Sequence, residues 1–158
     1  ILDISYLQDI YKTYLQAFGE DLAEKNGLLL DNYLVRFDFT NTDIVLALRQ
    51  FLGSFELPGE AQKIDRIIEK FSKKYVKDTK FKDELPFLQE PDNVYRLFFS
   101  IVMLNTDAHN PSIKKKMTLE QFIDNYSKTL TNHTLNDLEK DLFKKIYHDI
   151  NQTRLKLT

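Results

Sequence analysis

The chain contains no cysteine, and this absence removes several classes of site at once. Without a thiol there is no disulfide, no thiolate zinc site and no cysteine nucleophile, a composition that suits a reducing compartment. The 158 residues also contain no apolar run close to the roughly 18 residues that a membrane-spanning helix needs. The net charge of −2 shows no basic excess, so we expect no nucleic-acid partner.

Glycine and proline are scarce, with four of each in the chain. Because both residues interrupt helices, their scarcity and the long stretches at helical spacing predict an all-α fold. The hydrophobic content of 42%, which includes 12 Phe and 8 Tyr, excludes global disorder. We expect one domain over residues 1–158. Because the chain begins with Ile1 rather than Met, we also expect it to be a segment excised from a larger protein.

Several helices can be placed from apolar spacing and capping residues. The first is expected over residues 4–18, where Gly19 ends a run whose apolar face is Ile4, Leu7, Tyr11, Leu15 and Phe18. Others are expected after Thr42-Asp43, over 61–77, over the very apolar 93–106, and after the capping box that begins at Thr118. The last should start at Thr134 and turn these side chains inward: Leu135, Leu138, Leu142, Phe143, Ile146 and Ile150.

Residues 57–66 read Leu-Pro-Gly-Glu-Ala-Gln-Lys-Ile-Asp-Arg. The Pro58-Gly59 pair predicts a tight turn, because proline presets φ and glycine accepts positive φ. A helix follows at once, so the pattern predicts a loop that projects Glu60 outward. The plainer interpretation is an acidic residue at a helix start, where the helix dipole stabilises it by a few tenths to about 1 kcal/mol.

Residues 92–111 form a second motif, which starts with Asp92 and Tyr95 and continues as an apolar helix. It ends with Met-Leu-Asn-Thr-Asp-Ala-His-Asn-Pro at 103–111, and Lys-Met-Thr follows at 116–118. With Phe51-Leu52 and Phe55 ahead of the first motif, the chain resembles the Sec7 domain over about residues 40–150. This family is the catalytic core of exchange factors for Arf (ADP-ribosylation factor) GTPases.

Three segments depart from the family pattern. Ala108 stands where the family usually has leucine, and residues 1–39 match its early helices weakly. Residues 125–130 read Asn-Tyr-Ser-Lys-Thr-Leu where Asn-Arg-Gly-Ile-Asn is usual. The resemblance implies a right-handed superhelix of about ten helices, with a hydrophobic groove between the two motifs.

The resemblance also implies a function. The domain is expected to expel GDP from an Arf-family GTPase, with Glu60 inserted near the β-phosphate and the Mg²⁺ site. Such exchange makes and breaks no covalent bond, and it needs neither a cofactor nor a metal site in the domain itself. The alternative is a catalytically silent helical scaffold that only binds Arf. A hydrolytic enzyme would need paired catalytic residues, and none occurs at a recognisable spacing.

Two sets of site residues follow from the same resemblance. The residues expected to bind the GTPase are Asp92, Tyr95, Ile101, Met103, Leu104 and Asn110. Those expected to form a site for the inhibitor brefeldin A are Phe99, Ser100, Asp107 and Met117, with Phe99 where sensitive members usually have Tyr. The plainer alternatives are a helix cap for Asp92, a core-edge aromatic for Tyr95, and core positions for Ile101, Met103 and Leu104.

The remaining charged residues suggest weaker hypotheses. His109, His133 and His148 show no metal-ligand spacing, and we expect His109 to be a hydrogen-bonded structural residue at a helix end. Residues 63–82 hold eight basic and three acidic side chains, a net charge of +5 that either attracts an anionic membrane or is a solvated helix face. Residues 114–116 have the same two interpretations, or contact the GTPase. We expect a cytoplasmic monomer, recruited peripherally to Golgi or endosomal membranes through flanking regions.

Overall fold

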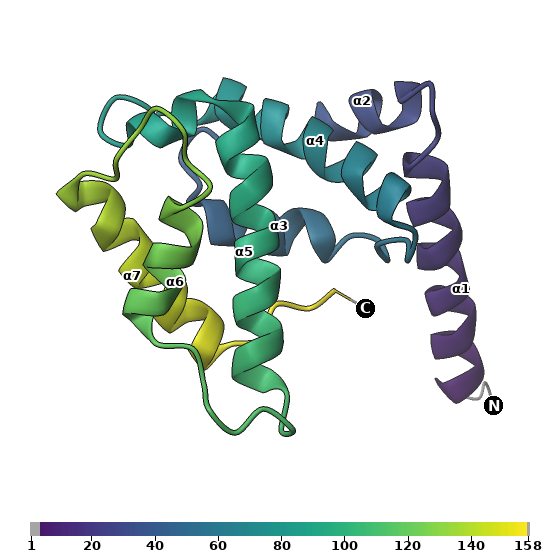
Figure 1. Cartoon of the computed structure of the whole chain (residues 1–158). Helices are drawn as coiled ribbons and strands as arrows, with labels where there is room; N and C mark the ends of the chain where they lie inside the picture. The colour runs from purple at the N-terminus through teal and green to yellow at the C-terminus, as the bar shows by residue number, and fades with distance from the viewer. Residues whose placement is uncertain (1–3, 158) are drawn as a thin grey trace.

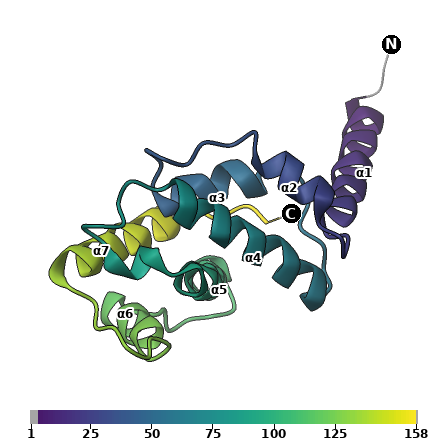
Figure 2. The same ribbon diagram turned by 90° about the horizontal axis from the view of Figure 1, so that it is seen from above.

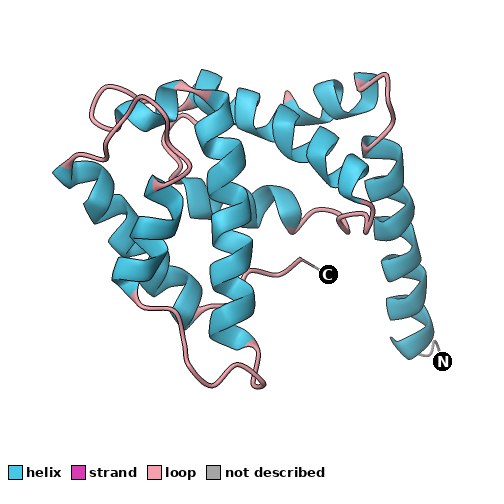
Figure 3. Ribbon diagram, viewed as in Figure 1, coloured by secondary structure: helices cyan, strands magenta, loops and turns pink. Residues whose placement is uncertain are grey.

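The computed structural model describes residues 4–157, and every regular element in that range is helical (Figure 3). The elements are α1 (Ile4–Leu22), α2 (Leu28–Leu34), α3 (Ile44–Leu52), α4 (Ala61–Asp78), the 3₁₀ helix η1 (Pro86–Gln89), α5 (Pro91–His109), α6 (Leu119–Ser127) and α7 (Asp137–Gln152). The predicted all-α class is therefore confirmed. The described residues hold seven α-helices where about ten were expected for the fold.

Helix α5 lies at the centre of the molecule, with α4 on one side and α6 and α7 on the other (Figures 1 and 2). The sequence dictates this position, because α5 is apolar on more than one face. Leu97, Phe98, Ile101 and Leu104 are all fully buried along it. Pro91 occupies the first turn, where its missing N–H costs nothing.

The core contains two groups of aromatic rings. In the first, Phe51 of α3 stacks on Phe71 of α4 at a centroid distance of 5.2 Å and meets Phe55 edge-on at 5.0 Å. In the second, Phe143 of α7 packs against Tyr126 of α6 at 4.8 Å and Phe87 of η1 at 5.5 Å. The first group therefore joins α3 to α4, and the second joins η1 to α6 and α7.

Two predicted helix starts are confirmed, and in both the N-cap residue bonds to a residue three positions later. Asp43 accepts a hydrogen bond from the Leu46 N–H, and the Thr118 and Gln121 capping box forms as predicted. The predicted start of the last helix at Thr134 is wrong. Asn136 caps α7 instead, in a capping box with Glu139.

Glu139 also explains why this start is fixed. Its carboxylate is fully buried and accepts hydrogen bonds from the N–H groups of Phe87 and Asn136. The His133 ring lies 2.8 Å from the same carboxylate. The buried carboxyl group is thus satisfied by two backbone donors and the His133 ring, and it ties the first turn of α7 to η1.

Two further side-chain expectations need correction. Leu138, predicted to face inward, is 56% exposed, because the side of the first turn of α7 that is packed against η1 is the one that carries the buried Glu139. In the first helix, Ile4 is 70% and Tyr11 63% exposed. Figure 1 shows the reason, because the first half of α1 projects past the other helices and only its second half lies beside them.

The turn at Pro58-Gly59 does not use the positive φ that was expected of Gly59. Among the described residues only Gly27 has a positive φ, of 68°, just before α2. A Cβ at Gly59 would have no atom within 4 Å. Gly59 is therefore in open space, and the loop does not need a left-handed residue there.

Gly19 does not end the first helix, which continues to Leu22. It is buried, and the carbonyl oxygen of Glu56 lies where a side chain would be: a Cβ at Gly19 would stand 1.9 Å from it. The N–H of the same Glu56 donates to the Leu15 carbonyl at 3.2 Å. Gly19 is thus the residue that lets the loop before α4 lie directly on α1.

This contact predicts opposite effects for two glycine substitutions. Gly19→Ala should destabilise the fold by about 1–3 kcal/mol, because the new methyl group must push backbone away from backbone. Gly59→Ala is the matched control and should leave stability unchanged or raise it by about 0.4–1 kcal/mol, since its surroundings are open. Urea unfolding followed by circular dichroism measures both. Equal midpoints for Gly19→Ala and the parent would contradict the close approach.

Candidate exchange surface

The loop that carries Glu60 is anchored on both sides of the residue. Phe55 and Pro58 are buried before it, and the Phe55 ring meets the Phe18 ring of α1 at a centroid distance of 6.4 Å. Glu60 itself occupies the N-cap position of α4 in an extended backbone conformation, with φ −81° and ψ 131°. Its side chain makes no capping hydrogen bond and is 71% exposed. An anchored loop thus presents a solvent-facing carboxylate.

One lysine lies beside this carboxylate. Lys63 Nζ is 3.3 Å from Glu60 Oε1, and it also contacts Glu20 Oε2 of α1. The hydrogen bond that Lys63 donates to Glu20 is the main reason that the pKa of Lys63 is raised above its usual value. One turn later, Arg66 donates to the Ala23 carbonyl at 3.0 Å, so α1 is tied to the first turns of α4 at two points.

The exposed side of α5 carries Tyr95, Phe99 and Met103, which are spaced four residues apart and therefore share one face. Tyr95 and Phe99 are half-buried and meet edge-on at a centroid distance of 5.0 Å, whereas Met103 is 59% exposed. We call these three residues the α5 apolar stripe. It is the accessible apolar surface that the second sequence motif leaves outside the core.

A hydrogen bond joins this stripe to α4. The Tyr95 hydroxyl donates to Asp65 Oδ1 at 2.7 Å. Because the ionised phenol would lose this bond and repel the carboxylate, Asp65 raises the pKa of Tyr95 to about 12. Asp65 lies five residues after Glu60, so the same end of α4 carries the exposed carboxylate and contacts the stripe.

Two of the predicted GTPase-binding residues are not on the surface. Ile101 and Leu104 are fully buried, as the alternative interpretation of core positions had it. The sequence could not separate them from Met103, because the whole segment is apolar. In this structure they support the stripe from inside the fold and line no accessible groove. Ser100, expected near the inhibitor, is half-buried on α5.

Asp92 lies in the first turn of α5 and is exposed. The position before this helix is taken by Glu90, which makes no side-chain capping bond. Asp92 is therefore not the N-cap, and its charge is free to act on the surface while it interacts favourably with the helix dipole.

The C-terminal end of α5 is held by hydrogen bonds to the loop that follows it. Lys116 Nζ donates to the carbonyl oxygens of Asp107 at 2.7 Å and Asn110 at 2.8 Å, and so satisfies groups at the helix C-terminus. Asp107 Oδ2 accepts from the Met117 N–H at 2.7 Å. The structure therefore brings Asp107 and Met117 into direct contact, while Asn110 stays exposed beside them.

His109 has the structural role that its position at a helix end predicted. Its Nε2 lies 2.5 Å from the Ile150 carbonyl oxygen, which links α5 to α7. Within residues 4–157 no group of three or more His, Asp or Glu residues could hold a metal ion. In the same range no helix is long and apolar enough to cross a membrane.

Half of the eight basic side chains in segment 63–82 form ion pairs within the molecule. Lys70 pairs with Asp31 of α2 at 2.6 Å, and Lys74 pairs with Asp78 at 3.0 Å. Lys73 pairs with Glu69 at 3.3 Å. With Lys63 also paired, these contacts favour the solvated helix face over an anionic membrane site.

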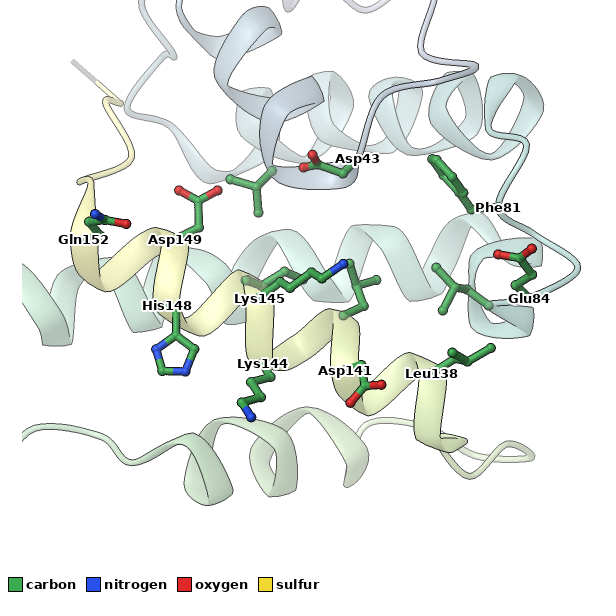
Figure 4. A pocket seen from close by; sticks show the side chains of 14 residues that line it. Asp43, Phe81, Glu84, Leu138, Asp141, Lys144, Lys145, His148, Asp149 and Gln152 are labelled. Atoms are coloured by element: carbon green, nitrogen blue, oxygen red, sulfur yellow. The ribbon is translucent and has the colours of Figure 1, made fainter.

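A large surface cavity lies elsewhere. Its volume is about 900 Å³, and it is lined by α3, α7 and the segment that contains Phe81 and Glu84 (Figure 4). None of the predicted site residues borders it. In Figure 4 the Lys144 and His148 side chains point away from α3, so they do not converge with Asp43 on a common point.

The comparisons with known proteins decide the family. The model of the Sec7 domain matches residues 4–155 of the chain. The chain belongs to the Sec7 domain family. The match includes most of residues 1–39, where the sequence motifs were weak.

Two curated relatives illustrate the similarity. The chain is 39% identical over 147 residues to the ADP-ribosylation factor guanine nucleotide-exchange factor SEC7 of Saccharomyces cerevisiae, covering 90% of this chain and 7% of that protein. It is 37% identical to cytohesin-2 of Mus musculus, covering 89% of this chain and 34% of that protein. The chain thus spans a small part of these relatives.

Solved structures agree. The Sec7p catalytic domain superposes with a TM-score of 0.73 at 35% identity, covering 90% of this chain and 71% of that one. A Sec7 domain bound to ARF1-GDP and brefeldin A gives 0.73 at 32% identity, covering 90% and 69%. The Sec7 fold predicted from the two motifs is confirmed.

The sequence did not reveal the roles of some residues on this Sec7 surface. Lys63 and Asp65 were part of the first motif but received no role, although Lys63 stands three residues after Glu60, a spacing at which helical side chains meet. Gly19 and Glu20 gave no usable signal, because their partners lie more than 35 residues away.

The contrast between two adjacent residues of α5 can be tested by stability. Leu104→Ala should cost about 2–5 kcal/mol, the range for a fully buried leucine, whereas Met103→Ala should change the free energy of unfolding by less than about 0.5 kcal/mol. Urea unfolding of both variants beside the parent measures this. A large loss for Met103→Ala would place Met103 in the core and remove it from the stripe.

Proposed function

We propose that this domain accelerates the exchange of GDP for GTP on an Arf-family small GTPase, with Glu60 inserted near the β-phosphate and Mg²⁺ of the bound nucleotide. The similar proteins named above as exchange factors, and the similar domain bound to ARF1-GDP, support the reaction and the partner. The observation that carries the assignment of Glu60 is its exposed carboxylate, held on a loop that is anchored to α1.

Elementary electrostatics gives Glu60 enough strength for this role. A small GTPase holds GDP largely through its phosphates, a P-loop lysine and Mg²⁺. A carboxylate at that point competes for the cations and repels the phosphate. Two unit charges 4 Å apart at an effective dielectric of 20 interact by about 4 kcal/mol. Such a term raises an off-rate by about a thousandfold.

The partner surface in this proposal is the α5 apolar stripe with its polar ends. Tyr95 and Met103 would contact apolar segments of the GTPase, while Asp92 and Asn110 would act at the two ends of α5. The Tyr95–Asp65 hydrogen bond keeps the stripe in a fixed relation to α4, and therefore to Glu60. Ile101 and Leu104 would not contact the GTPase and would only support the stripe by packing in the core.

The rival proposal is a helical scaffold that binds Arf without exchange activity. It predicts association and no GDP release. An uncharged side chain at position 60 would have favoured it, and this chain has glutamate there. We further propose that residues 1–158 are one catalytic domain of a longer protein, monomeric and acting on the cytoplasmic side of Golgi or endosomal membranes.

The central test replaces Glu60. Glu60→Ala and Glu60→Lys should lower the rate of labelled-GDP release from an Arf-type GTPase by at least about a hundredfold, because the competing carboxylate is gone. Binding to the GDP-loaded GTPase should persist, and Glu60→Lys should trap the complex best, since an ammonium attracts the phosphate.

The matched control is Glu120→Ala, which removes an exposed carboxylate from the first turn of α6 and should exchange like the parent. The domain is used in catalytic amounts, and binding is measured separately by calorimetry. Exchange by Glu60→Ala at the parent rate would contradict the role of Glu60. A parent domain that binds without releasing GDP would establish the scaffold instead.

The inhibitor site gives a separate prediction. We propose that brefeldin A binds along Phe99, Ser100, Asp107 and Met117, of which the last two are already in contact. Phe99 lacks the phenol of sensitive relatives, and one hydrogen bond is worth about 0.5–1.5 kcal/mol net. Phe99→Tyr should therefore lower the inhibitory concentration by about 2- to 12-fold.

Dose–response curves for the parent and Phe99→Tyr measure this shift. Phe99→Leu, which cannot form the hydrogen bond, is the control and should not become more sensitive. Complete resistance of the parent and Phe99→Tyr, with robust exchange, would overturn the inhibitor site while leaving the exchange function intact.

A further inference from the structure

Lys63 forms ion pairs with two carboxylates that differ in their exposure to solvent. Glu20 lies in the last turn of α1, and Glu60 occupies the N-cap position of α4 without a capping hydrogen bond. The Lys63 side chain is 28% exposed, that of Glu20 49%, and that of Glu60 71%. The ammonium therefore lies between a partly enclosed carboxylate and a solvent-facing one.

The contact with Glu20 is the closer of the two. Lys63 Nζ makes its hydrogen bond to Glu20 Oε2, while Glu60 Oε1 lies 3.3 Å away. The two contacts also rank in this order as causes of the raised pKa of Lys63. An ammonium has three donors and can contact both carboxylates, but the negative charge of the closer Glu20 offsets part of the attraction between Lys63 and Glu60.

The position of Glu20 is set by contacts that do not involve Lys63. Its neighbour Gly19 lies against the Glu56 carbonyl, and the Glu56 N–H bonds to Leu15. Arg66 of α4 donates to the Ala23 carbonyl, three residues past Glu20. Glu20 is thus held at the base of the loop that carries Glu60.

From this arrangement we infer that Glu20 is a positioning residue for nucleotide exchange: it draws the Lys63 ammonium towards α1, so that the ion pair between Lys63 and Glu60 stays the looser of the two and the Glu60 carboxylate can leave the domain surface. The inference rests on the exchange function proposed above. It adds that the activity of Glu60 is set by a competition between two carboxylates for one lysine.

The competition predicts an order of activities that a merely structural ion pair does not. In Glu20→Gln, Glu60 is the remaining ion partner of Lys63, so the pair that already exists between them should tighten, and it must break before Glu60 can act. Exposed ion pairs are weak, so kcat/KM for exchange should fall by only about 1.5- to 5-fold. Lys63→Gln should exchange at least as fast as the parent. The double variant should match Lys63→Gln, because the lysine that would neutralise Glu60 is gone.

If the pair only braced α1 against α4, the two single variants and the double variant would all lose activity alike. That result would overturn the inference, and so would an unchanged rate for Glu20→Gln. A matched control is Asp31→Asn, which removes the Lys70 partner of another interhelical pair on α4 and should exchange like the parent. The deficit of Glu20→Gln relative to the parent should also shrink as salt rises, because exposed ion pairs are screened.

A second measurement needs no GTPase. Scalar couplings across hydrogen bonds, between the ¹⁵N-labelled Lys63 ammonium and ¹³C-labelled carboxyl carbons, report which carboxylate holds the lysine. The parent should show the coupling to Glu20, and Glu20→Gln should show it to Glu60. Absence of the second coupling would overturn the inference even if exchange is robust. Inactivity of the parent domain with the expected couplings would instead refute the proposed function alone.

Discussion

The burial of α5 is the constraint on which the rest of the structure depends. Leu97, Ile101 and Leu104 are fully removed from water between α4, α6 and α7, and each buried side chain of this kind contributes roughly 1.5–3 kcal/mol. This packing fixes the rotation of the helix about its axis. It therefore decides that Tyr95, Phe99 and Met103 form the exposed stripe while their apolar neighbours do not.

The loop with Glu60 is fixed by a different kind of contact. Backbone lies on backbone where Glu56 passes Gly19, and ion pairs and hydrogen bonds extend the same junction to Lys63 and Arg66. The domain thus combines an apolar surface that the core orients with a carboxylate that a polar junction orients. The Asp65–Tyr95 hydrogen bond connects the two. This combination suits a protein that binds a partner through the α5 apolar stripe and presents a negative charge to it at Glu60.

Local signals predicted a good part of this structure from the sequence. Caps such as Asp43 and Thr118 were found because their partners lie within three residues. The start of α7 was missed although Asn136 and Glu139 have the local capping-box spacing, because Thr134 also resembles a cap. The further hydrogen bond from the Phe87 N–H to Glu139 is a tertiary contact that sequence spacing does not reveal.

The candidate site, too, could be predicted only in part from the sequence. The family motifs located Glu60 and helix α5, because each motif is a contiguous stretch of sequence. Periodicity could not choose between Met103 and Leu104, because α5 is apolar on several faces and only packing shows which face is covered. The role inferred for Glu20 depends on α1 meeting α4, and one acidic residue in an amphipathic helix gives no hint of it.

The absence of cysteine offers a direct test of the surface itself, because a single introduced thiol can be labelled cleanly. A nitroxide on Met103→Cys should broaden NMR signals from the apolar surface segments of a bound, GDP-loaded Arf-type GTPase. The same label on Leu138→Cys, which is exposed beside the cavity of α7, should leave those signals sharp. Broadening from position 138 and none from position 103 would contradict the account.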